Sequence, residues 1–72
     1  MNVNYVRSLR SYKNLTQAEM AKILNLSITS YNKKETNKVP FTLDEVKTLS
    51  EYFGVAIENF FKDEVFNLNT GS

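Results

Sequence analysis

Residues 16–36, TQAEMAKILNLSITSYNKKET, decide how this chain folds. The stretch is predicted to form two short helices, over about residues 17–24 and 27–35, joined by a tight turn at Asn25 and Leu26. Asn25 suits that turn because asparagine adopts a positive φ more readily than most residues. Thr16 and Glu19 have the spacing of a capping box, which marks the start of the first helix. A helix of two turns is marginal alone, so neighbouring elements are expected to hold the pair.

The residues on either side supply those neighbours. Over residues 2–13, apolar residues recur at spacings of three and four, which predicts an amphipathic helix that ends near Asn14 and carries Arg7 off its apolar face. Thr42 and Glu45 form a second capping box and open a further helix, which Gly54 ends. A short last helix is expected to include Phe60 and Phe61. The sequence therefore predicts an all-α, compact five-helix domain over residues 1–62, followed by a short tail at 63–72.

Length and composition narrow the class of protein. A domain of 72 residues buries only about 60% of the surface of its unfolded chain, so the core must be small. The chain has no Cys and no His, which excludes disulfides, the usual zinc sites and His-based catalysis. Neither a phosphate-binding glycine loop nor a nucleophile with its base is visible, so we expect no enzyme activity and no cofactor. No apolar run is long enough for a membrane span, and the expected location is cytoplasmic.

Charge is divided unevenly along the chain. Residues 1–38 hold seven Lys or Arg and two Glu, whereas residues 39–72 hold two Lys and six Asp or Glu. The first part is therefore about +5 and the second about −4, although the whole chain is only +1. Such a division indicates one face suited to an anionic polymer. The alternative is that solvated helix faces differ by chance.

The motifs, taken together, resemble a known family. VRSLR at 6–10, LTQAEMAKIL at 15–24 and YFGVAIENFF at 52–61 follow one another as in the helix-turn-helix of the lambdoid phage repressor and Cro group, also called the XRE type. The resemblance covers residues 6–61. It implies a lambda-repressor-like fold in which the recognition helix, residues 27–35, enters the major groove of double-stranded DNA. It also implies a homodimer on a two-fold operator.

The resemblance assigns base contacts to the outer face of the recognition helix. Lysine donates to guanine, isoleucine packs on a thymine methyl group, threonine does either, and asparagine pairs with adenine if its orientation permits. The residues carried across by position are Ile28, Thr29 and Lys33, and Asn32 is included as their neighbour. Without the surrounding motif, the same pattern describes an ordinary solvated surface.

Phosphate contacts and a structural ion pair follow from the same resemblance. Gln17 lies at the start of a helix, where the side chain and nearby N–H groups suit a phosphate. Lys38, Asn37 and Lys13 are expected to flank the groove; for Lys13, an ordinary surface lysine is an equal alternative. Arg10 is expected to pair with Glu35, which makes it structural first and a phosphate contact second.

Four positions depart from the family pattern. Asn25 and Asn37 stand where glycine is common, Lys34 where an apolar residue is more frequent, and Ala56 where a capping Ser or Thr is frequent.

The candidate dimer interface consists of Val39, Pro40, Phe41, Ile57 and Phe60. The alternative is that these residues simply belong to the core of the monomer.

Two functions from different classes fit the sequence. The first is a sequence-specific DNA-binding transcriptional regulator, a small repressor or Cro-like switch of a phage or mobile element. The second is a protein-interaction module, such as an antitoxin that uses the tail at 63–72. Neither requires a small-molecule ligand or a membrane.

Overall fold

The structure is a computed structural model, and it describes residues 1–62. Within that range the chain forms four α-helices and one 3₁₀ helix, in the order α1 (Val3–Tyr12), α2 (Gln17–Ile23), α3 (Ile28–Glu35), α4 (Leu43–Phe53) and η1 (Ile57–Phe61). The described residues contain no strand, which agrees with the predicted all-α class. The tail at 63–72, and with it the antitoxin hypothesis, lies outside the described residues.

Each α-helix begins with a side-chain cap. Thr16 and Thr42 form the two predicted capping boxes, in which the threonine accepts from the backbone N–H of the glutamate that in turn accepts from the threonine N–H. Ser27 caps α3 by accepting from the N–H of Ser30, and Asn2 caps α1. These bonds satisfy N–H groups that have no partner inside a helix.

All four α-helices end in the same way. The residue after the last turn has a positive φ, between 57° and 65°, and it is Asn14, Asn25, Asn37 or Gly54. The N–H of the following residue then donates to a carbonyl five residues back, as from Leu26 to Ala21 at 2.8 Å. This pattern of a left-handed residue and a returning hydrogen bond stops the helix and turns the chain. The structure thus confirms the positive φ expected at Asn25, and Asn14 and Asn37 adopt it as well.

The last element corrects the expected fifth α-helix. Ile57–Phe61 is a 3₁₀ helix of five residues, and its capping position, Ala56, makes no side-chain hydrogen bond. A 3₁₀ helix suits so short a segment because its tighter turn closes with fewer residues. The segment also closes the domain, since the Asn2 N–H donates to the Phe60 carbonyl at 2.8 Å.

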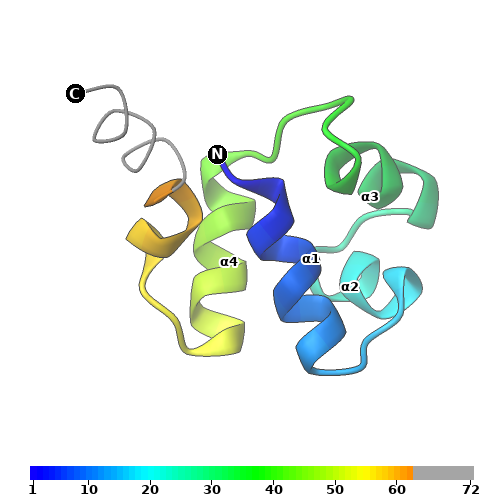
Figure 1. Cartoon of the computed structure of the whole chain (residues 1–72). Helices are drawn as coiled ribbons and strands as arrows, with labels where there is room; N and C mark the ends of the chain where they lie inside the picture. Colours follow the sequence, from blue (N-terminus) through cyan, green and yellow to red (C-terminus); the bar gives the residue numbers. More distant parts are fainter. Residues whose placement is uncertain (63–72) are drawn as a thin grey trace.

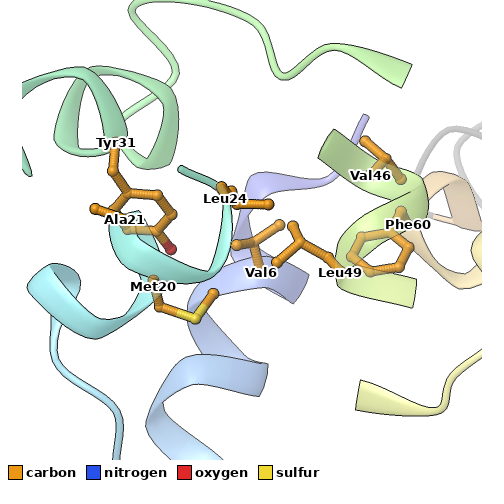
Figure 2. Packing of buried hydrophobic residues seen from close by; sticks show 8 residues of the cluster. All are labelled: Val6, Met20, Ala21, Leu24, Tyr31, Val46, Leu49 and Phe60. Atoms are coloured by element: carbon orange, nitrogen blue, oxygen red, sulfur yellow. The ribbon is translucent and has the colours of Figure 1, made fainter. Parts of the chain in front are cut away.

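The core joins all five elements around α1. In Figure 1, α1 lies between the α2–α3 pair and α4, and η1 packs against both α1 and α4. Figure 2 shows the eight buried apolar side chains, which come from every element or its capping residue: Val6, Met20, Ala21, Leu24, Tyr31, Val46, Leu49 and Phe60. Ala21, a small residue of α2, is 2% exposed, and α2 packs against α3. This packing holds α3 on one side of the domain, with its other side open.

Candidate nucleic-acid interface

Helix α3 has one buried face and one exposed face. Tyr31 and Glu35, four residues apart, are buried with 0% and 2% of their surfaces exposed. Ile28, Thr29 and Lys33 are exposed, and Ile28, an apolar residue, exposes 53% of its surface. Asn32 is partly buried beside them. The four residues expected to contact bases therefore share the open side of α3.

The buried face of α3 is fixed by the carboxylate of Glu35. Its Oε2 accepts from Arg10 Nε at 2.8 Å and from the Tyr31 hydroxyl at 2.7 Å. Its Oε1 accepts from Gln17 Nε2 at 2.8 Å and from Arg10 Nη2 at 3.2 Å. Charge-assisted bonds of this kind are stronger than neutral ones and are directional. One side chain at the end of α3 is thereby tied to α1, to α2 and to the previous turn of its own helix.

Arg10 and Arg7, which both lie on α1, donate hydrogen bonds to Glu35 at the C-terminal end of α3. Arg10 also donates through Nη1 to the Leu15 carbonyl at 3.1 Å, so all three of its guanidinium nitrogens are used inside the molecule. This favours its structural role over a direct phosphate contact. Arg7, which the sequence reading placed off the packed face, donates to the Glu35 carbonyl at 2.7 Å and to Asn4. A cation at a helix C-terminus stabilises the unpaired carbonyls there.

Gln17 connects the buried carboxylate to the exposed face. Its amide nitrogen donates to Glu35, and its Oε1 accepts from Asn32 Nδ2 at 3.2 Å. The side chain expected to meet a phosphate is thus engaged with α3 in the free protein. Its contact with a phosphate stays a prediction.

A second ion pair joins α3 to α4. Lys34 Nζ lies 2.6 Å from Glu45 Oε1 and 2.7 Å from Oε2, and the two side chains expose only 11% and 13% of their surfaces. Glu45 also accepts from the Thr42 N–H at 2.8 Å as part of the capping box. The position where the family more often has an apolar residue is therefore occupied by a lysine whose charge is paired.

These contacts shift the acid–base behaviour of the residues involved. Burial alone raises the pKa of Glu35, but hydrogen bonds from Arg10, Tyr31 and Gln17 outweigh it and hold that pKa below its ordinary value. Glu45 behaves in the same way, with Lys34 and the Thr42 N–H lowering its pKa against burial. The hydrogen bond to Glu35 raises the pKa of Arg10, while burial and that carboxylate raise the pKa of Tyr31.

Acid is therefore expected to destabilise the fold through these two carboxylates. A folded-state pKa below the ordinary value of 4.5 means that the unfolded chain binds protons more readily. Stability is then fully present above about pH 5 and is lost as the pH falls through 4.5 toward the lowered folded pKa values. Urea unfolding from pH 7 to pH 3 measures the slope, which Glu35→Gln should make shallower. Glu51→Gln, which removes an exposed carboxylate of α4, is the matched control. An unchanged slope in Glu35→Gln would contradict this account.

The remaining expected phosphate contacts lie in different places. Asn37 and Lys38 are exposed directly after α3, where the Lys38 N–H donates to the Lys33 carbonyl at 2.8 Å. Lys13 has its Nζ 5.6 Å from the ring centre of Tyr12 and lines a surface pocket with Leu15, Tyr52 and Phe53. Those neighbours belong to α1, α4 and the loop after α1. Asn37 and Lys38 therefore follow α3 directly, whereas the neighbours of Lys13 belong to other elements.

The expected dimer interface divides into surface and core. Val39 and Pro40 are exposed, and Phe41 and Ile57 are partly buried. Phe60, by contrast, is 0% exposed and meets the ring of Tyr5 edge-on, with ring centres 4.9 Å apart. A side chain that is already enclosed has no surface to offer a second copy. The burial of Phe60 fits the alternative explanation, in which this residue belongs to the monomer core.

Sequence reasoning missed the Arg7 contact and the Lys34–Glu45 pair. Arg7 lies three residues before Arg10, so both arginines face the same side of α1; that spacing was the available signal. Lys34 and Glu45 are eleven residues apart on separate helices, and no local pattern predicts their meeting.

The described residues give no indication of a metal site or a membrane helix. Residues 1–62 contain no group of three His, Cys, Asp or Glu placed to hold a metal ion. Across the same residues, no helix has the length and apolar character to cross a membrane.

A family model described as a helix-turn-helix domain matches residues 4–67. No curated protein matches the chain, and no solved structure does.

Proposed function

Since the chain belongs to this helix-turn-helix domain family, we propose that it binds double-stranded DNA sequence-specifically and regulates transcription, acting as a repressor. The observation that carries the proposal is the two-sided α3. Its inner side is tied to α1 and α2 through Glu35, and its outer side exposes Ile28, Thr29 and Lys33. A rigidly held helix with an open polar side is what major-groove reading requires.

The parts of the domain have separate tasks in this proposal. Helix α3 enters the major groove, where Lys33 donates to guanine and Ile28 packs on a thymine methyl group. Lys38 and Asn37, exposed after α3, contact phosphates, and the start of α2 at Gln17 lies across the backbone. Phosphate contacts set the position of the protein and its affinity, and base contacts set the sequence.

A second copy completes the proposed complex. One short helix reads only a few base pairs, so specificity is gained by placing two copies on half-sites about 34 Å apart. The surface proposed for pairing comprises the exposed Val39 and Pro40 and the partly buried Phe41 and Ile57. The genetic setting that we propose is a small regulator of a phage or mobile element.

Replacing Lys33 and Lys38 by alanine separates base reading from phosphate binding. Lys33→Ala should relax the preference at one base position by roughly 5- to 150-fold, the equivalent of about 1–3 kcal/mol. Lys38→Ala should weaken binding to all duplexes alike and reduce the slope of log affinity against log salt by about 1. Selection from a random duplex pool, followed by salt titrations on the selected sites, measures both effects.

Lys47→Ala is the matched control, because Lys47 is an exposed lysine on α4, away from the proposed contacts. It should leave both the base preference and the salt slope as in the wild type. Absence of binding at low salt, both to random duplex and to the DNA upstream of the protein's own coding sequence, would overturn the proposed function.

A further inference from the structure

A chain of hydrogen bonds runs from the core to the open side of α3. It begins at the buried carboxylate of Glu35, passes to Gln17 Nε2 at 2.8 Å, and continues from Gln17 Oε1 to Asn32 Nδ2 at 3.2 Å. Glu35 is 2% exposed, while Gln17 and Asn32 are each partly buried. These hydrogen bonds thus link a buried carboxylate to a residue beside Ile28, Thr29 and Lys33.

The direction of these hydrogen bonds is set by the carboxylate of Glu35. An ionised carboxylate only accepts hydrogen bonds, so the Gln17 amide must turn its NH₂ group toward Glu35. Its carbonyl then faces α3 and, as an acceptor, requires a donor there. Asn32 meets that need with its NH₂ group. Both amides are therefore fixed against the flip that interchanges donor and acceptor.

The hydrogen bond to Gln17 leaves one acceptor and one donor of the Asn32 amide unused. Asn32 Oδ1 accepts no hydrogen bond from the described residues, and among those residues no buried side-chain nitrogen or oxygen lacks a partner. Oδ1 is therefore accessible from outside. The Asn32 NH₂ group has a second N–H beyond the one given to Gln17. An oriented acceptor with one remaining donor complements the N6 amino group and N7 of adenine, whereas guanine offers two acceptors along the same edge.

From this geometry we infer that Asn32 reads an adenine in the major groove and that Gln17 is a positioning residue. Because Gln17 donates to Glu35, its carbonyl accepts from Asn32 and so fixes the orientation of the Asn32 amide. The inference rests on the proposed DNA binding and adds to it the base that one side chain selects. It also gives Gln17 a role in specificity besides its expected phosphate contact.

Two variants test the two halves of the inference. Asn32→Ala removes the reading group, so the adenine preference at its position should fall by roughly 5- to 150-fold, the range of a paired base contact. Gln17→Met keeps the length of the side chain but breaks the chain of hydrogen bonds, so the preference at the same position should fall by about 5-fold or more with Asn32 intact. Lys38→Ala serves as the control that weakens all sequences without changing any preference.

The experiment is selection of wild-type and variant proteins on a random duplex pool, followed by binding constants for duplexes that differ only at the affected position, at one salt concentration. Circular dichroism and thermal melting of each variant identify any loss of fold, and Asn32→Ala, at a partly buried position, keeps the base assignment testable if Gln17→Met unfolds. In that event, Gln17→Lys replaces it: a lysine still donates to Glu35 but offers no acceptor to Asn32, so the preference at the Asn32 position should fall, and an unchanged preference overturns the positioning role.

Each outcome has one meaning. If the wild type binds no duplex, the proposed function fails. If it binds selectively but Asn32→Ala changes no position, or changes one that does not prefer adenine, the base assignment fails while DNA binding stands. If Asn32→Ala loses the preference and folded Gln17→Met retains it, the positioning role of Gln17 is wrong.

Discussion

Glu35→Ala is expected to lower the free energy of unfolding by about 3–5 kcal/mol, the cost of removing one partner of a buried ion pair. The alanine leaves the Arg10 guanidinium, the Tyr31 hydroxyl and the Gln17 amide without their common acceptor. Arg10 keeps 24% of its side chain exposed, so water replaces part of the lost bonding and places the loss toward the lower end. Native domains have a total stability of only about 5–15 kcal/mol, so a loss of this size removes a large share of it.

Urea unfolding followed by circular dichroism at pH 7 measures this loss. Glu51→Ala makes the same chemical change on the exposed surface of α4 and should alter stability by less than about 0.5 kcal/mol. Adding Arg10→Met to Glu35→Ala should restore part of the loss, because the double variant no longer carries an uncompensated cation. A loss below about 1 kcal/mol in Glu35→Ala would show that the carboxylate does not hold α3 as described.

Phe60→Ala should destabilise the monomer by about 3–5 kcal/mol, as expected when a fully buried phenylalanine is truncated. The ring packs against Tyr5 and lies in the shared core of α1, α4 and η1. Removing it leaves a cavity at the point where the two ends of the described domain meet, since the Phe60 carbonyl also accepts from Asn2. Phe60→Leu, which retains most of the volume, should cost less than about 1.5 kcal/mol.

This change also distinguishes the core from a dimer surface. Thermal melting at several protein concentrations should show a lowered midpoint for Phe60→Ala that does not depend on concentration. Val39→Ala, on the exposed loop, should leave the monomer midpoint nearly unchanged and affect only association. Wild-type stability in Phe60→Ala with weakened association would mean that the residue belongs to an interface after all.

Helix starts and ends were predictable because they depend on nearby residues. A threonine three residues before a glutamate satisfies N–H groups within one turn, and both such pairs form capping boxes. Asparagine tolerates a positive φ because of its own short polar side chain, and Asn14, Asn25 and Asn37 all adopt it. Only the last segment differed, where Ala56 provides no cap and a 3₁₀ helix replaces the expected α-helix.

The side-chain network of α3 was predictable only in part. The pairing of Arg10 with Glu35 was expected from the family resemblance, and the two side chains lie 2.8 Å apart. The contact of Arg7 with the Glu35 carbonyl, the bond from Asn32 to Gln17 and the Lys34–Glu45 pair were not expected. Each joins groups on different elements, and their meeting depends on the angle at which α3 leaves the turn.

By itself, then, the sequence determined where the helices lie, how the turn between α2 and α3 is made, and which side of α3 is polar, because capping, φ preference and periodicity act within a few residues. Tertiary structure decided which of the polar residues are used inside the domain. Packing placed Phe60 in the core, brought Gln17 between Glu35 and Asn32, and paired Lys34 with Glu45. Those outcomes depend on distances between helices, which a hydrogen bond must match to within a few tenths of an ångström.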